Sequence, residues 1–307
     1  MTSVLYDAPG PKARTRSRMF SIVGTIIILA GVVLLALALG APKPSANGAV
    51  QPGLWDPTRW DVFTDVQVWR SIWGGVLATL RMAAVGAVIA LVLGVVFSFA
   101  RSADHKAIRV PAAIILEFVR GMPVLLMMLF ILLVFATGSF WAGVLALGVY
   151  NGAIIGEALR AGIQSLPRGQ REAGLAIGLT PLATRFRIEF PQAFRQMLPI
   201  IIAQLVVLLK DTSLAFIVGY SELLRVGARN LPDFFGNRYF FSFFLVVFVI
   251  YLAMNLTLSW FARFIARRSG PKAGKLTPTE PTLTPKDSLA SVRGSYSTGD
   301  AGGPGPA

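Results

Sequence analysis

The amino-acid sequence predicts an all-α integral membrane protein, and this prediction follows from composition and from the length of the apolar runs. Of the 307 residues, 54% are hydrophobic and only 14% are charged, and the mean hydropathy is +0.64. A helix needs roughly 20 consecutive apolar residues to cross a bilayer. Four windows without a charged residue reach or approach that length, namely 19–41, 82–100, 121–156 and 239–262.

Six spans account for these runs. A single helix over 121–156 would be about 54 Å long at ~1.5 Å per residue, which is too long for one crossing. The ATGS sequence at 136–139 supplies a turn that divides it. Residues 196–219 form a further apolar stretch, interrupted by Lys210 and Asp211. The predicted spans are 19–41, 72–99, 112–135, 140–159, 197–218 and 240–262.

The distribution of lysine and arginine orients these spans. With the N-terminus inside, the inner flanks of the spans, counted as far as Lys275, hold 18 of these side chains and the outer segments hold 6. Because cytoplasmic flanks carry the excess of basic residues, both termini are predicted to be cytoplasmic. The net charge of +14 follows mostly from this bias, with some attraction to anionic lipid, and requires no nucleic-acid partner.

The predicted organisation is one membrane domain with additions at both ends. The first apolar run could also be a cleaved signal peptide, because ALGAP at 38–42 has small residues at cleavage spacing. Its apolar core exceeds the usual ~7–15 residues, which favours an uncleaved span. The predicted parts are a cytosolic N-terminal tail (1–18), an additional transmembrane helix (19–41), an extracytoplasmic loop (42–71), the membrane domain (72–268) and a disordered cytosolic tail (269–307).

Signatures of soluble enzymes are missing from the sequence. The absence of cysteine excludes disulfides, thiol catalysis and thiolate metal sites. No G-x-x-x-x-G-K-[ST] motif occurs, and the single histidine, His105, lies in a short polar loop. The sequence therefore predicts no catalytic site, no cofactor and no metal.

One charged segment, GQREAGLAIGLTPLATRFRIEFP at 169–191, lies between apolar runs and is too polar to cross a bilayer. It is predicted to form two short helices, with Thr180 capping the second and Pro181 in its first turn. An apolar stripe at helical spacing continues through the break, and the arginines are predicted to face the cytosol. The stripe consists of Leu175, Leu179, Leu182, Phe186 and Phe190. On this pattern alone, an amphipathic helix at the membrane surface explains the segment.

The spacing within this segment resembles the EAA loop of ABC-transporter permeases, E-A-A-x3-G-x9-I-x-L-P. The matching residues are Glu172, Ala173, Gly174, Gly178, Ile188 and Pro191. Gly174 stands for the second alanine, and Phe190 stands for the leucine. Further stretches resemble the polar amino-acid permeases of binding-protein-dependent importers, namely EFVRGMPVLLMMLF (117–130), YNGAIIGEALRAGIQSLPRGQREAG (150–174) and KDTSLAFIVGYSELL (210–224). VLYDAPGPK at 4–12 and the additional first helix are most similar to the glutamate-importer permeases of actinobacteria.

The resemblance implies a type I ABC importer permease fold, with about six transmembrane helices and a cytosolic coupling helix. It implies as partners two cytosolic ATPase subunits, a second permease of the same or a different chain, and an external amino-acid-binding protein. Glu172 would then offer a carboxylate to a basic group of the ATPase, and Gly178 would allow close approach or a sharp exit from the helix.

The implied activity is ATP-driven import of a polar amino acid, with glutamate first, across the cell membrane. ATP hydrolysis would take place on the partner subunits, so that this chain would be no enzyme. Arginine, glutamine or histidine are alternative substrates. A secondary transporter driven by an ion gradient is an alternative of another class, but it would have no use for an EAA loop. A membrane scaffold without transport is a third, disfavoured by polar groups within the spans.

Polar residues inside the predicted spans are candidates for the substrate path or gate. These residues are Arg81, Lys210, Asp211, Thr212 and Ser213. Charges are costly in lipid, so one interpretation is an ion pair, Lys210–Asp211 or Arg81–Asp211, that holds helices in register. The other is that Arg81 binds the carboxylate of an anionic substrate. The KDTS sequence resembles a family-wide motif, which favours a role in the gate or the fold.

Two further sets of residues follow helical spacing. Glu117–Arg120 and Glu157–Arg160 lie near the inner ends of their spans, where each spacing of three places both partners on one helix face. Snorkelling at the membrane boundary explains these ion pairs. A stripe of small residues at Gly148, Gly152 and Gly156 favours close helix packing within the subunit over a dimer seam.

Overall fold

Long apolar runs fold into five helices that are long enough to cross a membrane, counted over the part of the chain that the structure describes. The structure, a computed structural model, describes residues 11–44 and 50–269. The five helices are α1 (Pro11–Gly40), α2 (Val66–Arg101), α5 (Ser139–Gln164), a continuous helix from Pro181 to Phe216, and α11 (Phe240–Ser269). A bent pair of helices supplies a sixth span if it is counted as one. The prediction of an all-α protein with about six spans is confirmed, whereas the tails before residue 11 and after residue 269 lie outside the described residues.

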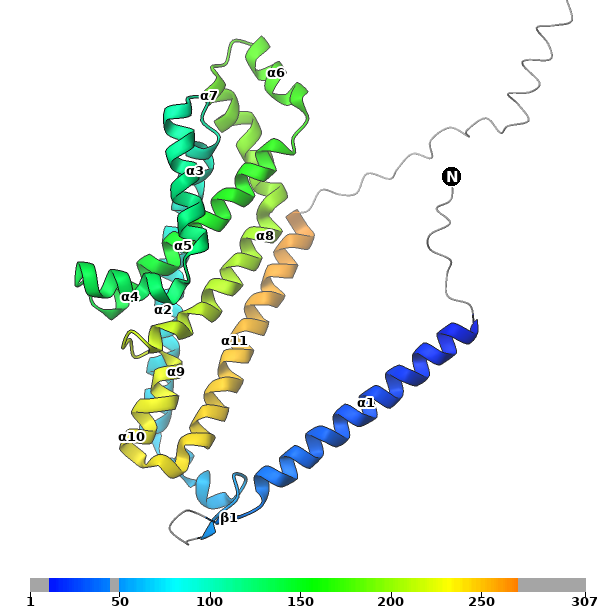
Figure 1. Ribbon diagram of the computed structural model, residues 1–307, viewed down its shortest axis with the longest axis vertical. Helices are drawn as coiled ribbons and strands as arrows, with labels where there is room; N and C mark the ends of the chain where they lie inside the picture. Colours follow the sequence, from blue (N-terminus) through cyan, green and yellow to red (C-terminus); the bar gives the residue numbers. More distant parts are fainter. Residues whose placement is uncertain (1–10, 45–49, 270–307) are drawn as a thin grey trace, which may run out of the picture.

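The span predicted at 112–135 is not a single continuous helix, because the chain bends in its middle. The axes of α3 (Lys106–Gly121) and α4 (Val124–Phe135) differ by 104°. Pro123 has no amide hydrogen to continue the helix, and a residue before proline avoids the helical region. Met122 is accordingly extended, with φ −87° and ψ 131°. As a result, α4 protrudes from the side of the bundle (Figure 1).

The centre of the bundle is formed by α2 and α5, which run parallel to each other. A Cβ atom built on Gly94 of α2 would lie 2.6 Å from the Ile155 side chain of α5. The reverse holds at three glycines of α5, where an added Cβ would come within 3 Å of α2 side chains: Gly148, Gly152 and Gly156. The predicted role of this glycine stripe in packing within the subunit is confirmed.

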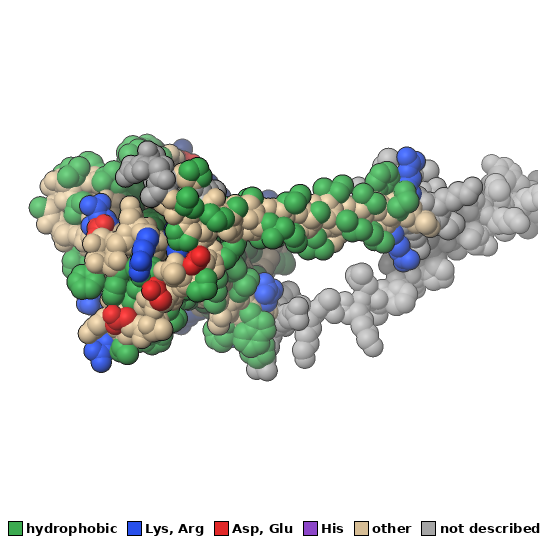
Figure 2. Space-filling model, turned by 90° about the horizontal axis from the view of Figure 1, so that it is seen from below, with side chains coloured by type: hydrophobic (Ala, Val, Ile, Leu, Met, Phe, Trp, Pro, Cys, Tyr) green, Lys and Arg blue, Asp and Glu red, His purple; other side chains and the backbone are tan. Residues whose placement is uncertain are grey.

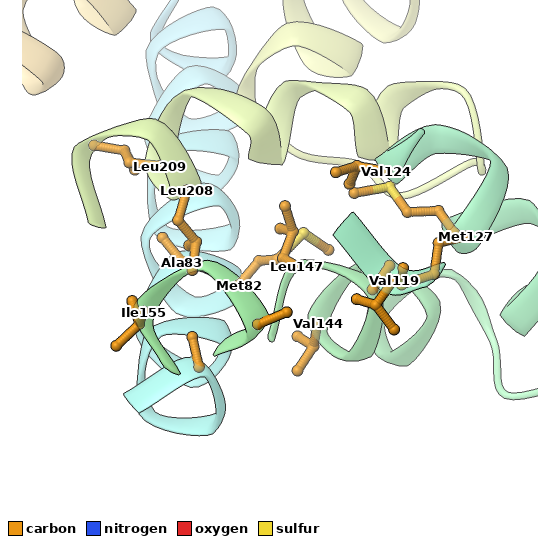
Figure 3. Close-up of a cluster of buried hydrophobic side chains, with 14 of the residues drawn as sticks. Met82, Ala83, Val119, Val124, Met127, Val144, Leu147, Ile155, Leu208 and Leu209 are labelled. Atoms are coloured by element: carbon orange, nitrogen blue, oxygen red, sulfur yellow. The ribbon is translucent and has the colours of Figure 1, made fainter. Parts of the chain in front are cut away.

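Side chains from α8 and from the bent pair complete the hydrophobic core. Figure 3 shows Leu208 of α8 beside Ala83 of α2, with Met82 and Leu147 next to them. Val119 and other buried side chains of α3 and α4 extend the same cluster away from α8. The core therefore fixes the position of the bent pair relative to α2 and α5.

The helix that contains the span predicted at 197–218 begins well before that span, at Pro181. One continuous helix comprises α7 (Pro181–Thr184), the π-turn η3 (Arg185–Glu189), α8 (Phe190–Asp211) and the 3-10 turn η4 (Thr212–Phe216). In η3 the backbone N–H of Phe190 donates to the carbonyl of Arg185, five residues back, and Pro191 follows without breaking the helix. The second half of the charged segment, from Pro181 onward, is thus part of the same helix as the span.

Short elements close the opposite end of the bundle, which we call the α10 end. Helix α2 starts at Val66 rather than at residue 72, because Asp65 caps it by accepting a hydrogen bond from the N–H of Gln67. The last residues of the predicted loop 42–71 therefore lie in the first turns of α2. The elements at this end are β1 (Lys43–Pro44) paired with β2 (Val50–Gln51), η1 (Pro57–Arg59), η2 (Asp61–Thr64), α9 (Leu223–Arg225), η5 (Val226–Asn230), α10 (Leu231–Phe235) and η6 (Asn237–Tyr239).

Helix α1 leans away from the bundle and meets it only near its C-terminal end (Figure 1). Trp55 holds that end. Its indole N–H donates to the carbonyl of Ala36 at 2.8 Å, and its ring lies against Phe241 with centroids 5.4 Å apart. Figure 2 shows hydrophobic side chains along α1 with Lys and Arg gathered at its far end. An extended apolar surface of this kind suits contact with lipid.

Candidate functional site

The short helix α6 (Arg168–Ala176) ends in a turn that requires glycine. Gly178 has φ +86°, a conformation in which any Cβ atom is strained. Its N–H donates to the carbonyl of Leu175 at 3.0 Å, and the N–H of Leu179 donates to Gly174 at 3.1 Å. This is a Schellman motif. No atom lies within 4 Å of a Cβ built on Gly178, so the geometry fits the expected sharp exit and not a close approach.

The charged segment has two arms, α6 and the start of the helix at Pro181, and the second arm starts as predicted. The N–H of Ala183 donates to the Thr180 hydroxyl at 3.3 Å, and Pro181 occupies the first turn. The two arms then pack on each other through Gly174. A Cβ atom there would lie 2.5 Å from Thr184 and 2.9 Å from Ile188, so glycine in place of alanine suits this tight contact.

Not every side chain of the segment faces the direction that spacing predicted: Arg187 is exposed, as expected, but Arg185 is not. Leu182 and Phe186 are 65% and 60% exposed, whereas Arg185 and Glu189 are buried. The segment passes through the turn at Gly178 and through η3, and each of these changes the phase of the helix relative to a regular 3.6-residue repeat. The exposed residues around α6 form what we call the α6 surface, which consists of Glu172, Leu175, Ile177 and Leu182.

At mid-depth on α2, Arg81 is exposed and lies over an aromatic ring. Its guanidinium carbon is 5.0 Å from the centroid of Phe140, the second residue of α5. The rings of Phe140 and Tyr220 are 5.5 Å apart, and the Tyr220 hydroxyl donates to the carbonyl of Ala78 at 3.4 Å. This cation–aromatic cluster lies where α2, α5 and the end of η4 meet.

Neither of the two predicted mid-span ion pairs forms. Within the described residues, no ion pair involves Arg81, Lys210 or Asp211. Successive residues of a helix do not face each other, which keeps Lys210 and Asp211 apart. The hydroxyls that follow bond to the end of α8, with Thr212 donating to Leu209 at 2.7 Å and Ser213 donating to Lys210 at 2.9 Å.

Both predicted pairs at i and i+3 are present, and a third cation joins them. The carboxylate of Glu117 lies 3.6 Å from Arg120, and that of Glu157 lies 2.5 Å from Arg160. Arg101, the last residue of α2, lies 3.8 Å from Glu117 and 3.9 Å from Glu157. The network connects α2, α3 and α5, a link that spacing along one helix could not indicate.

Sequence reasoning missed Glu222, which is fully buried at the α10 end. Its carboxylate accepts hydrogen bonds from the N–H groups of Leu224 and Arg225, each at 2.8 Å, and from the Tyr251 hydroxyl at 2.5 Å. Glu222 thereby caps α9 and ties it to α11. A carboxylate directly before the apolar LL pair was the available sequence signal.

The cavities differ in polarity. An apolar groove of about 830 Å³ runs between α2, α8 and α11, and no charged side chain lines it. A mixed cavity of about 630 Å³ lies at the α6 end, between α6, η3 and the turn after α2. No group of three or more His, Asp or Glu side chains among the described residues is placed to hold a metal ion.

These features define a multi-pass helical membrane protein in which a charged, two-armed segment is folded against the ends of the spans. The model of the family described as "Binding-protein-dependent transport system inner membrane component" matches residues 99–270. The chain belongs to this family.

Characterised relatives align over most of their own length. The chain is 36% identical to the glutamate transport system permease protein GluD of Corynebacterium glutamicum over 233 residues, which is 73% of this chain and 82% of the relative. It is 32% identical to the glutamine transport system permease protein GlnP of Escherichia coli over 214 residues, covering 65% and 96%.

Solved structures agree on the fold. The crystal structure of an amino acid ABC transporter with histidines matches with a TM-score of 0.60 and 29% identity, covering 68% of this chain and 98% of that chain. An inward-facing MetNI methionine ABC transporter matches with a TM-score of 0.57 at 17% identity, covering 67% and 100%. The expected type I importer permease fold is confirmed.

Proposed function

We propose that the chain is the permease subunit of a binding-protein-dependent ABC importer for polar amino acids, with glutamate as the substrate. The observation that carries the proposal is the 36% identity to a glutamate permease over 73% of this chain. Relatives named for glutamine and arginine transport stand at 32% and 27% identity. They are the alternatives among substrates.

The α6 surface is the proposed contact with the ATPase subunits. A helix that only supports the fold would bury its apolar side chains, but Ile177 is 76% exposed and Leu182 is 65% exposed. Apolar side chains beside an exposed carboxylate, here Glu172, suit a groove with an apolar floor and a basic rim. Because α7, η3 and α8 form one helix, a push on this surface moves a membrane span directly.

The remaining partners and the orientation follow from the same proposal. The α6 end faces the cytosol with both termini, in agreement with the bias of Lys and Arg. The importer consists of two permeases, two ATPase subunits that hydrolyse ATP, and an external binding protein that delivers the amino acid. The apolar flank of the bundle and α1 contact membrane lipid.

The experiment that tests this function is uptake into proteoliposomes containing the complex of this chain with its ATPase, its binding protein and any second permease. Uptake of labelled glutamate is expected to require ATP in the compartment that the ATPase subunits face. It is expected to persist when ion gradients are clamped at zero. Unlabelled glutamine, arginine and histidine serve as competitors. Uptake that continues without ATP, or competition by another amino acid stronger than that by glutamate, contradicts the proposal.

Arg81 is the proposed contact for the substrate carboxylate, together with a gate formed around Lys210, Asp211, Thr212 and Ser213. Arginine is costly in lipid, so an exposed guanidinium at mid-depth is expected to face the translocation path of the assembled importer. Phe140 holds it by a cation–π contact. A bound carboxylate would be the missing counter-charge.

Replacing Arg81 with glutamine is expected to raise the glutamate concentration for half-maximal uptake by about 10- to 100-fold, since a charge-assisted hydrogen bond contributes roughly 1.5–3 kcal/mol. Uptake kinetics in proteoliposomes give the value. Arg70→Gln is the matched control, because Arg70 is an exposed arginine of the same helix. If the half-maximal glutamate concentration of Arg81→Gln equals that of Arg70→Gln, Arg81 does not contact the substrate.

A further inference from the structure

Asp104 occupies a position that joins three separate parts of the chain. It lies in the turn between α2, which ends at Arg101, and α3, which begins at Lys106. Its Oδ1 atom is 3.4 Å from Nη2 of Arg171 in α6 and 3.5 Å from Nη2 of Arg185 in η3. One carboxylate oxygen therefore contacts both arms of the charged segment.

The arginine on the η3 side depends on this contact. The Arg185 side chain is only 8% exposed, and its other acidic neighbour, Glu189, lies 3.9 Å away. Its Nε atom is buried without a hydrogen-bond partner among the described residues. A charge buried to this extent needs a nearby counter-charge. The carboxylates of Asp104 and Glu189 therefore hold η3 in place through Arg185.

The contact of Asp104 with Arg171 on the α6 side is exposed to water, so it is weaker than the buried contact and can rearrange. The side chains of Arg171 and Asp104 are 43% and 56% exposed, and they border the mixed cavity of about 630 Å³. Ion pairs exposed to water contribute little to stability. The link between Asp104 and Arg171 is therefore suited to controlling geometry, and the fold does not depend on this exposed link.

We propose that Asp104 is a positioning residue that ties both arms of the coupling segment to the turn between α2 and α3. Displacement of α6 by the ATPase then moves α2 and α3 together with α8, and the bent pair α3–α4 moves with them. This inference rests on the coupling role proposed above, and it adds a connection that the EAA pattern does not contain. Arg171 and Arg185 are the two residues through which Asp104 acts.

The test uses the full complex in proteoliposomes and measures basal ATP hydrolysis, its stimulation by loaded binding protein, and glutamate uptake per ATP hydrolysed. Asp104→Asn is expected to assemble normally and keep basal hydrolysis, while stimulation and uptake per ATP fall several-fold. Asp104→Glu retains the carboxylate and is expected to restore most of the coupling. A residue with a purely structural role would change complex yield and basal hydrolysis first.

Asp61→Asn is the matched control at the α10 end. The Asp61 side chain is also 56% exposed and lies 3.6 Å from Arg238, so this variant removes a comparable ion pair without touching the coupling segment. If Asp104→Asn couples as well as the parent protein does, the proposal is wrong. If it lowers complex yield, Arg171→Gln tests the link from the exposed side, and normal coupling there overturns the proposal. A parent complex without substrate-stimulated hydrolysis would instead contradict the proposed function itself.

Discussion

Glu172→Arg is expected to leave the protein inserted in the membrane and to lower ATP-driven uptake by roughly 10-fold or more. Within the described residues Glu172 forms no ion pair, and its exposure on the α6 surface makes the carboxylate available to a partner. If that partner is basic, reversing the charge replaces an attraction by a repulsion, which costs several kcal/mol at an interface. The measurement is uptake together with co-purification of the ATPase.

Asp233→Arg controls for the charge change itself. Asp233 is an exposed acid in α10, at the opposite end of the bundle. Normal uptake in both variants would reduce the segment to a surface amphipathic helix, whereas equal loss in both would indicate a general effect on insertion. Only a loss confined to Glu172→Arg supports the ATPase contact.

Two glycines, Gly169 in α6 and Gly178 in the turn after it, separate backbone geometry from side-chain contact in the same region. Neither Gly178 nor Gly169 has an atom within 4 Å of an added Cβ, but only Gly178 has positive φ. Alanine at Gly178 therefore costs about 1–2 kcal/mol of turn stability, and alanine at Gly169 costs nothing by this mechanism. Uptake should fall in the first variant only, because the exit angle of α6 sets the position of Glu172. Gly178→Arg adds bulk and charge and should lose more.

The spans were predictable because a crossing requires a long apolar run wherever it occurs. The bend at Met122–Pro123 was missed because apolar composition continues through it, although Gly121 and Pro123 carried the signal. The continuity of the helix from Pro181 into the span was missed for the opposite reason. Charged residues in η3 read as a surface helix, and sequence gives no indication that a π-turn continues the helix into the membrane.

The candidate site was predictable where its residues are close in sequence. The turn at Gly178, the cap at Thr180 and the pairs at spacing three all depend on local geometry. The contact of Asp104 with Arg171 and Arg185 joins residues 67 and 81 positions apart, so no local pattern indicates it. The burial of Arg185 likewise depends on tertiary packing, which overrides the tendency of arginine to face water.

The buried carboxylate of Glu222 is the position where substitution should reduce stability most. Alanine there removes the acceptor for two backbone N–H groups of the α9 turn and for the Tyr251 hydroxyl, which retains Thr79 and Thr212 as neighbours. The expected cost is about 3 kcal/mol, because each unsatisfied buried group costs roughly 1–3 kcal/mol and some relaxation follows. At ~2–4 °C per kcal/mol, the thermal midpoint of the purified protein should fall by about 6–12 °C.

Two further variants divide this effect between its contacts. Tyr251→Phe removes only the hydroxyl group, so it should cost about 1 kcal/mol, while the two backbone hydrogen bonds of Glu222 persist. Glu222→Gln keeps one acceptor oxygen but brings N–H donors against donors, and its cost should lie between the two. Asp233→Ala, which removes an exposed carboxylate from the same end, should leave the midpoint unchanged. If Glu222→Ala also leaves it unchanged, water replaces the carboxylate at the cap, and the junction of α2, α9 and α11 is held by packing of Leu223 and Val226 against Gly75 instead.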